Sequence, residues 1–279
     1  MTAQKKICVI GNPISHSRSP LIHNYWIKQH ELEAQYQREE ISSEELPEFL
    51  RTLSSHGYIG ANITIPHKQA AYENVEIADE NAKRLKAVNT IYFQNGKLCG
   101  TNTDGEGFLE NLKHQVPSWR AKTGPALILG AGGAARAIIG ALLDEGVEKI
   151  FLVNRTIEKA QELADQFGPT IIPLRWDQLE EKLPQARLLV NTTSLGMTGK
   201  PPLELDISQL AKGAIVADIV YAPLETDLLR VAKQRGHETV DGLGMLLHQA
   251  VRGFELWFDI KPEVTPQLRN LIIADLEKA

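Results

Sequence analysis

The stretch PALILGAGGAARAIIGALLDEG, residues 125–146, decides the fold. Its apolar run Ala126–Leu129 leads directly into Gly130 and Gly132, which with Ala135 match the pattern G-x-G-x-x-G/A. A segment with the apolar spacing of a helix follows. Glycines let the backbone turn tightly and approach a pyrophosphate, which the amide groups at the positive end of a helix bind. The stretch therefore predicts a dinucleotide-binding unit.

The next apolar strand, KIFLVNRT at residues 149–156, indicates which dinucleotide binds. NAD-binding proteins usually carry Asp or Glu at its end, where the carboxylate holds the ribose 2′-hydroxyl. This chain has Asn154, Arg155 and Thr156 there. A guanidinium pairs with a 2′-phosphate that a carboxylate would repel, so the sequence favours NADP over NAD. An ordinary exposed surface arginine is the alternative interpretation of Arg155.

Short runs rich in Ile and Val alternate with longer amphipathic segments, which is typical of an α/β protein with a mostly parallel sheet. A length of 279 residues suggests about two domains. The turn-rich segment VPSWRAKTG, residues 116–124, marks a boundary. We expect an α/β substrate domain at residues 1–115 and a Rossmann-type, doubly wound domain at residues 116–241. Residues 241–258 open a long amphipathic helix.

The first half of the chain has clear local signals. Residues 6–11 and 57–65 are predicted strands, and Asn95-Gly96 between two apolar runs predicts a tight hairpin. Ser19 before Pro20 predicts a helix cap, with the helix running to about His30.

Composition excludes several classes of function. Hydrophobic residues make up 43% of the chain and the net charge is −5, so no positive field exists to attract nucleic acid. Cys8 and Cys99 lie far apart without metal-ligand spacing, which predicts neither a disulfide nor a metal site. No signal peptide and no membrane-spanning run is visible. We expect a soluble cytoplasmic protein.

Polar residues gather at loops and strand ends of the first predicted domain. They are Ser17, Ser19, Thr64, Lys68, Asn89, Asn102, Thr103 and Asp104. Carboxyl ends of strands in open α/β sheets bind ligands, so these side chains can converge on one crevice. Hydroxyls, amides, a lysine and a carboxylate suit a small polyhydroxylated substrate, with Lys68 as a general acid toward a carbonyl oxygen and Asp104 orienting its ammonium.

Plainer roles remain open for these residues. Ser19 and Asp104 can simply cap helices, and Lys68 can be an ordinary solvated lysine. His16 and His67 lie within the same motifs, and we favour loop and packing roles for both.

Seven ordered motifs carry a resemblance: GNPISHSRSP, NITIPHK, AVNT, NTDG, GAGGAAR, NRT and DGLGM. In this order they resemble the shikimate dehydrogenase family over essentially the whole chain. The resemblance implies NADPH-dependent reduction of 3-dehydroshikimate to shikimate, on the route to chorismate and the aromatic amino acids. It also implies that helices within residues 242–279 return to complete the substrate domain.

The family pattern makes Lys68 and Asp104 the catalytic pair. It implies that Ser17 and Ser19 hold the substrate carboxylate near Tyr221, and that ring hydroxyls and the reacting end contact Thr64, Lys68, Asn89, Asp104 and Gln249. The implied coenzyme contacts are Gly130, Ala131, Gly132, Gly133, Ala134, Asn154, Arg155, Thr156, Lys159, Ile219, Gly242 and Glu80, with Ile219 and Gly242 near the nicotinamide.

Two positions depart from the family pattern. Many NADP-dependent relatives carry an arginine where this chain has Lys159, which keeps the charge but loses bidentate geometry and leaves the strength of the NADP preference open. Gly100-Thr101 replaces a second acidic residue that relatives often have. A quinate/shikimate dehydrogenase of broader substrate and cofactor use and a non-catalytic NADP-binding regulator are the competing interpretations. A monomer or a homodimer is expected.

Overall fold

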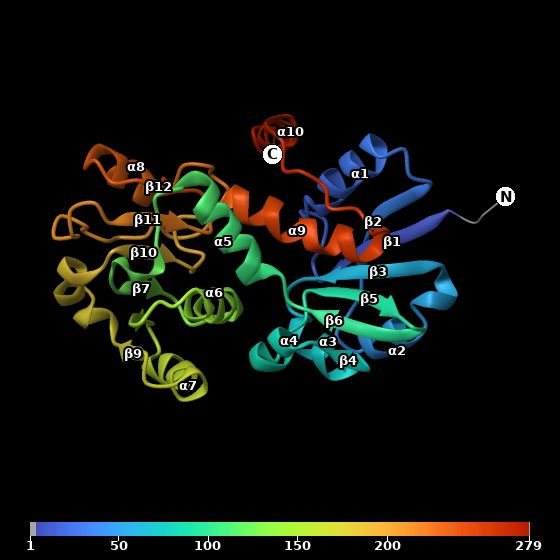
Figure 1. The fold of residues 1–279 in the computed structure, drawn as a ribbon, viewed down its shortest axis with the longest axis horizontal. Helices are drawn as coiled ribbons and strands as arrows, with labels where there is room; N and C mark the ends of the chain where they lie inside the picture. Colours follow the sequence, from blue (N-terminus) through green and yellow to red (C-terminus); the bar gives the residue numbers. More distant parts are fainter. Residues whose placement is uncertain (1–3, 279) are drawn as a thin grey trace. The chain divides into compact units, whose positions relative to one another are not determined.

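The computed structural model describes residues 4–278, which form two units (Figure 1). The first unit comprises the chain up to Thr103 and the chain from Gln249 onward. The second unit is Asp104–His248. The chain passes between the units at Thr103–Asp104 and again within helix α9 (Gly242–Phe258).

The second unit is built on a six-stranded, wholly parallel sheet in the order β12-β11-β10-β7-β8-β9. Its strands are β7 (Ala126–Leu129), β8 (Ile150–Val153), β9 (Ile171–Leu174), β10 (Leu188–Asn191), β11 (Ile215–Asp218) and β12 (Thr239–Val240). The chain moves outward from β7 in one direction and then restarts at β10 in the other, which is the doubly wound order of dinucleotide-binding folds. The predicted Rossmann-type fold is confirmed.

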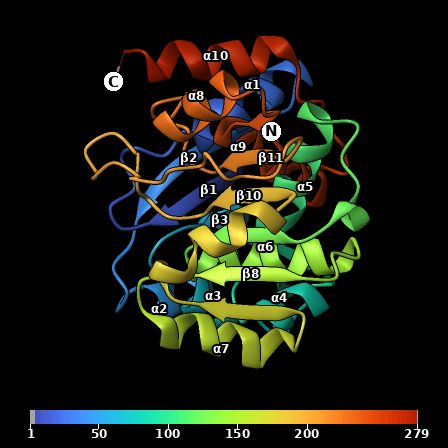
Figure 2. The same ribbon diagram turned by 90° about the vertical axis from the view of Figure 1, so that its left-hand side faces the viewer.

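Helices cover both faces of this sheet because successive strand residues point to opposite sides. On one face Ile128 packs with residues of α5 (Asp104–Gln115), α6 (Gly133–Asp144) and α7 (Ile157–Phe167). On the other, Leu127 packs with residues of α8 (Asp227–Gln234) and of short 3-10 segments. Figure 2 shows α7 beside β9 and α8 beside β11.

The first unit has a mixed six-stranded sheet in the order β2-β1-β3-β5-β6-β4 (Figure 1). Its strands are β1 (Lys5–Gly11), β2 (Ala34–Glu40), β3 (Tyr58–Ile63), β4 (Ile77–Ala78), β5 (Thr90–Gln94) and β6 (Lys97–Thr101). Strand β1 runs parallel to β2 and β3, whereas β5 is antiparallel to β3 and β6. Asn95 and Gly96 have φ of 53° and 78°, as a tight hairpin turn requires, so the predicted hairpin is confirmed.

The helices of the first unit come from both ends of the chain. The N-terminal part supplies α1 (Ser19–Gln29), α2 (Leu46–Arg51), α3 (Lys68–Asn74) and α4 (Glu80–Leu85). The C-terminal part supplies the last part of α9 and α10 (Pro266–Leu276). Trp257 Nε1 donates to Ile91 O at 2.9 Å, and Trp26 Nε1 donates to Glu263 O at 3.0 Å. The predicted return of the C-terminal helices is therefore confirmed.

Two expectations differ in detail from the structure. Arg18, not Ser19, is the N-cap of α1, because Ser19 is already helical and makes no capping bond. The units change at residues 103/104 and 248/249, whereas the sequence suggested boundaries at 115/116 and 241/242. Helix α5 explains the difference, since a Cβ on Gly105 would lie 2.6 Å from Ala137 O of α6 and Asn111 Nδ2 donates to Asp241 O at 2.7 Å.

A buried histidine lies in the aromatic core of the first unit. His23 is fully buried, its ring stacks on Tyr36 with centroids 4.3 Å apart, and Trp26 and Phe254 lie beside it. Within residues 4–278 neither ring nitrogen has a hydrogen-bond partner. Burial lowers the pKa of His23 from 6.5 to about 3. Between about pH 3 and pH 6.5, the imidazole is therefore neutral in the folded protein and protonated in the unfolded chain.

His23→Phe should flatten the pH dependence of stability. The favourable contribution of neutral His23 is complete above pH 6.5 and is lost as the pH falls toward 3. Each pH unit in that window costs about 1.4 kcal/mol, so the natural chain should lose about 2 kcal/mol more than His23→Phe between pH 7 and pH 5. Urea unfolding at both values measures this. The exposed His56→Gln is the control and should behave as the natural chain does; equal losses in all three proteins would contradict the account.

Candidate active site

The glycine loop of the second unit leaves its backbone uncovered. Gly130, at the end of β7, has φ of 100°, and a Cβ there would lie 2.8 Å from Thr192 Oγ1. Gly132 is the N-cap of α6 and Gly133 its first residue. Among residues 4–278, no atom beyond the adjacent residues and the helix's own backbone lies within 4 Å of the position that a Cβ would take on either. These residues fit a dinucleotide, because a pyrophosphate can approach the bare amides at the positive end of the helix.

The end of β8 presents cations to the solvent. Asn154 Nδ2 donates to Thr156 O at 2.8 Å and fixes the turn into α7. Arg155, Thr156 and Lys159 are exposed there. In the described part of the chain, the side chains of Arg155 and Lys159 make no hydrogen bond or ion pair. Two unpaired cations at a helix N-terminus suit a phosphate group.

A glycine also controls the end of β11. A Cβ on Gly242, the first residue of α9, would lie 2.2 Å from Ile219 O. Helix α9 can therefore start against the loop after β11 only with glycine at this position. Ile219 and Tyr221 are half-buried in that loop. Ile219 and Gly242, the two residues expected near the nicotinamide, are thus brought together within the second unit.

In the first unit the ends of β1 and β3 place two of the predicted substrate segments. Arg38 donates from Nε (3.1 Å) and Nη2 (2.6 Å) to Ser17 O, and Ser19 N–H points to Ser17 Oγ at 3.4 Å. Thr64 N–H donates to Ile10 O at 2.9 Å directly after β3. Lys68 is the first residue of α3 and is half-buried. The Ser17–Ser19 loop and the Thr64–Lys68 segment therefore follow neighbouring parallel strands.

Asn89 and Thr103 are buried and form an amide–hydroxyl network that reaches the half-buried Gln249. Asn89 Nδ2 donates to Thr103 Oγ1 at 3.0 Å, and Asn89 Oδ1 accepts from Thr103 N–H at 2.9 Å. The Thr103 hydroxyl donates to Gln249 O at 2.8 Å. The structure thus brings together residues that lie far apart in the sequence. The orientation of the Asn89 amide is fixed by its partners, as a binding site for hydroxyl groups requires.

Asn62 extends this network and was missed by the sequence analysis. The Tyr36 hydroxyl donates to Asn62 Oδ1 at 2.6 Å, while Asn62 Nδ2 donates to Thr90 Oγ1 at 3.0 Å and to Asn89 O at 3.3 Å. A signal was present, because Asn62 is the single amide in the apolar strand β3 and lies two residues before Thr64, on the same face.

Other predicted residues lie in simpler settings. Asp104 is buried at the start of α5 in the second unit. Glu80 is exposed on α4, with its carboxylate 2.7 Å from Lys83 Nζ. His67 is buried with Nε2 2.7 Å from Ile41 O, which agrees with the packing role favoured for it, and His16 is exposed.

Metal and membrane features are not found in the described residues. Over residues 4–278, no cluster of three or more His, Cys, Asp or Glu side chains is arranged to bind a metal ion. No helix in this range has the length and apolar character to span a bilayer. Cys8 and Cys99 are both buried free thiols.

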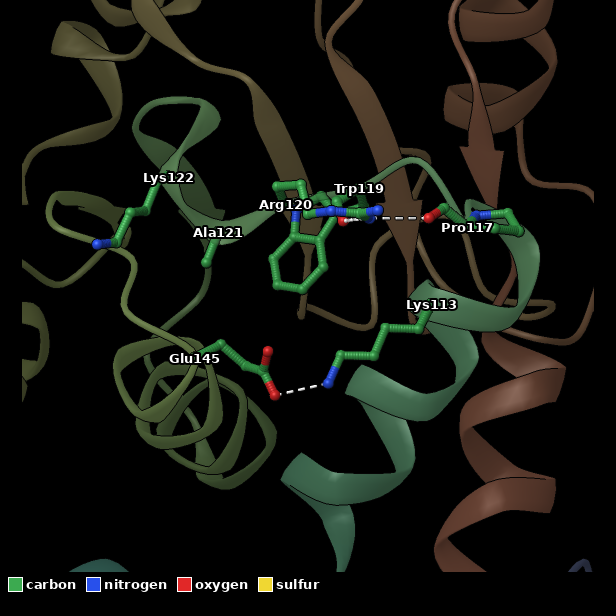
Figure 3. Close-up of a pocket in the computed structure, with 7 residues that line it drawn as sticks. All are labelled: Lys113, Pro117, Trp119, Arg120, Ala121, Lys122 and Glu145. Atoms are coloured by element: carbon green, nitrogen blue, oxygen red, sulfur yellow. Dashed lines mark hydrogen bonds and ion pairs between the residues drawn. The ribbon is translucent and has the colours of Figure 1, made fainter.

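A shallow pocket of about 560 Å³ lies elsewhere in the second unit (Figure 3). It is lined by Lys113, Pro117, Trp119, Arg120, Ala121, Lys122 and Glu145. These loops lead into β7 and β8, so the pocket is at the end of the sheet opposite the glycine loop. Lys113 Nζ pairs with Glu145 at 2.6 Å, and Arg120 Nη1 donates to two backbone carbonyls. Its charges are largely engaged, and it holds no predicted site residue.

Family models match three parts of the chain. The shikimate dehydrogenase substrate-binding domain matches residues 9–91, shikimate/quinate 5-dehydrogenase matches residues 111–198, and the shikimate 5′-dehydrogenase C-terminal domain matches residues 242–266. The NADP(+)-dependent shikimate dehydrogenase of Nitrobacter hamburgensis is 54% identical over 279 residues, covering 99% of this chain and 97% of the relative.

This chain belongs to the shikimate dehydrogenase family.

Two solved structures share the fold over nearly their whole length. Shikimate 5-dehydrogenase from Thermus thermophilus, in complex with NADP(H) and shikimate, has 35% identity and a TM-score of 0.85, covering 98% of this chain and 99% of that one. Quinate dehydrogenase from Corynebacterium glutamicum, in complex with NAD, has 32% identity and a TM-score of 0.90, covering 97% and 99%. The same fold therefore occurs in a structure with NADP(H) and shikimate bound and in one with NAD bound.

Asn62→Ala and Tyr36→Phe should show a coupled loss of stability. Asn62→Ala leaves the buried Tyr36 hydroxyl without its acceptor, whereas the double variant removes both partners. The double variant should therefore be more stable than the sum of the single effects by about 1 kcal/mol in urea unfolding.

Tyr25→Phe provides the matched control for this cycle. Its hydroxyl lies 3.4 Å from Thr265 Oγ1, and the hydrogen bonds of Asn62 go to other residues. Combined with Asn62→Ala its effect should simply add. Equal coupling for Tyr25 and Tyr36 would contradict the network.

Proposed function

We propose that this chain catalyses the reversible, NADP(H)-dependent interconversion of 3-dehydroshikimate and shikimate, acting as a reductase in chorismate and aromatic amino acid biosynthesis. The observation that carries the proposal is the 54% identity, over nearly the whole of both chains, to a relative named NADP(+)-dependent shikimate dehydrogenase. Cytoplasmic location and a monomeric or homodimeric state remain predictions.

The proposed substrate contacts use hydroxyls and amides, with one charged group for the reacting oxygen. Ser17 and Ser19, with Tyr221, bind the carboxylate of the substrate. Its ring hydroxyls bind Thr64, Asn89 and Gln249. The hydrogen bonds that already fix Asn89 support this role, because an amide held in one orientation discriminates donors from acceptors.

The proposed coenzyme contacts include the uncovered backbone of the glycine loop and the unpaired cations after β8. Residues 130–134 bind the pyrophosphate, Asn154, Arg155, Thr156 and Lys159 bind the 2′-phosphate end, and Ile219 and Gly242 contact the nicotinamide. Glu80 is also a proposed coenzyme contact; its side chain is 91% exposed and its carboxylate pairs with Lys83.

Lys68 is the proposed general acid. Bound NADPH supplies the hydride to the ring ketone carbon. The Lys68 ammonium donates a proton to the ketone oxygen, and in the reverse direction the neutral amine takes it from the alcohol. Asp104 orients the ammonium and accepts a hydrogen bond from the substrate. Lys68 lies at the first position of a helix that begins beside Thr64, which supports a fixed placement.

Quinate/shikimate dehydrogenase is the second candidate. The similarity to a quinate dehydrogenase in complex with NAD favours it, whereas Arg155 and Lys159 favour NADP. Initial rates with shikimate or quinate, each with NADP or NAD, decide between them. A rate confined to shikimate with NADP supports the proposal. Comparable rates with quinate and NAD would favour the second candidate, and no rate in any combination would favour a non-catalytic regulator.

Lys68→Ala should lower kcat for shikimate oxidation by roughly 10²- to 10⁴-fold while changing the KM for shikimate less than about threefold. The reason is that a proton donor acts mainly in the transition state. The exposed Lys97→Ala in the same unit is the control and should match the natural enzyme. A large rise in KM with kcat unchanged would make Lys68 a binding residue instead.

Arg155→Ala should raise the KM for NADP about tenfold and leave the KM for NAD unchanged within about twofold, since only NADP carries the phosphate that the guanidinium pairs with. Arg175→Ala is the matched control, because Arg175 is exposed in the same unit and pairs with Asp177. Equal changes for both coenzymes would show that Arg155 does not recognise the 2′-phosphate.

A further inference from the structure

Asp218 is a buried carboxylate with three hydrogen-bond donors. It ends β11 and is 2% exposed. Its Oδ1 accepts from Asn191 Nδ2 at 3.0 Å and from Val220 N–H at 3.0 Å, and its Oδ2 accepts from the Thr226 hydroxyl at 2.8 Å. All three partners are themselves buried. One side chain therefore joins two strand ends and the start of a helix.

The loop of residues 219–226 is held at both ends by this carboxylate. Val220 lies near its beginning, and Thr226, at its end, also caps α8 by accepting from Leu229 N–H at 3.4 Å. At β10, Asn191 Oδ1 accepts from Thr193 N–H at 3.0 Å and from the Thr193 hydroxyl at 2.7 Å. The carboxylate thus fixes the 219–226 loop and, through Asn191, the turn that follows the neighbouring strand.

A buried carboxylate at this position lowers the stability of the folded protein at neutral pH. Burial raises the pKa of Asp218 from 3.8 to about 6, and the three neutral donors only partly offset that effect. The stability contribution of this group is complete below pH 3.8 and is lost as the pH rises through about 6, so the charge weakens the fold at neutral pH. Groups that cost stability while fixing a loop beside a ligand site are commonly retained for function.

The 219–226 loop carries two of the residues that we propose for coenzyme and substrate binding. Ile219 follows Asp218 directly, and its carbonyl packs against Gly242. Tyr221 follows the Val220 amide that the carboxylate holds. These are the residues proposed to contact the nicotinamide and the substrate carboxylate. The loop has no regular secondary structure before α8, so its conformation depends on its hydrogen bonds.

We propose that Asp218 is a positioning residue for hydride transfer, which holds the 219–226 loop so that Ile219 and Tyr221 have fixed places. This inference rests on the proposed function. It assigns Asp218 no contact with substrate or coenzyme, and its effect is exerted through Val220 and Thr226.

The chain contains a matched control for this carboxylate. Asp206 in the same unit also accepts from the N–H two residues on, Ser208 N, at 2.8 Å, and from the Ser208 hydroxyl at 2.9 Å. It is exposed and holds no predicted site residue. Asp206→Ala therefore removes a similar turn without touching the 219–226 loop.

The kinetic test compares Asp218→Ala, Thr226→Val, Thr226→Ser and Asp206→Ala with the natural chain. We expect kcat for shikimate oxidation to fall about tenfold in Asp218→Ala and about threefold in Thr226→Val, because small misplacements of reacting groups cost rate. Thr226→Ser keeps the hydroxyl and should restore kcat, and Asp206→Ala should leave it unchanged. The Kd for NADP, measured by titration, should change less than about twofold, since most proposed coenzyme contacts lie on other strands. If kcat of the folded Asp218→Ala and Thr226→Val proteins equals that of the natural chain, the inference is wrong.

Hydrogen exchange on the same proteins separates this inference from the proposed function. In Asp218→Ala, or in Thr226→Val if the alanine variant does not fold, the amides of residues 219–222 and 224–226 should exchange at least about tenfold faster while those of β7 and β8 stay unchanged. Absence of shikimate oxidation by the natural chain would overturn the proposed function and with it the catalytic part of the inference. Unchanged exchange in the loop would overturn the positioning role itself, whatever the activity.

Discussion

Parallel strand pairing is the constraint on which the rest of the structure depends. Because β8 and β10 both run parallel to β7, the glycine loop, the turn at Asn154 and the end of β10 emerge at one edge of the sheet. The same geometry in the first unit brings the end of β1 beside Thr64 after β3. Backbone amides and carbonyls at such edges have no strand partner, so polar side chains and ligands supply the missing hydrogen bonds. Both candidate binding regions therefore follow from sheet topology before any particular side chain is considered.

Buried polar groups in the two units fall into distinct classes. Asn62 and Asn89 have donors and acceptors that satisfy one another, which fixes their orientation at little cost. Asp218 is satisfied by hydrogen bonds but still bears the cost of a buried charge. His23 lacks a partner within the described residues and relies on its aromatic neighbours. Hydrogen bonds therefore fix the side chains of Asn62, Asn89 and Asp218. Packing against aromatic rings fixes His23.

Local features were predictable from the sequence, and features made by distant residues were not. Strand β7 was predicted with its observed ends, and the Asn95-Gly96 turn was recognised, because apolar runs and glycine turns depend on adjacent residues. The capping role of Ser19 was wrong because the preceding loop already takes a helical conformation at Arg18. Asn62 and Asp218 were not recognised, since their importance comes from partners that only the folded strands bring near. Most individual site roles came from the family resemblance, which encodes such distant pairings indirectly.

The central claim is that this chain places a shikimate ring on the residues of its first unit, with the reacting oxygen at Lys68. A crystal structure with shikimate and NADP bound tests it most directly. The account predicts the substrate carboxylate on the Ser17 and Ser19 hydroxyls, and Lys68 Nζ within about 3.2 Å of the hydroxyl to be oxidised. It also predicts the 2′-phosphate beside Arg155. Shikimate bound elsewhere, or bound here with Lys68 turned to solvent and its reacting hydroxyl on another group, would contradict the account.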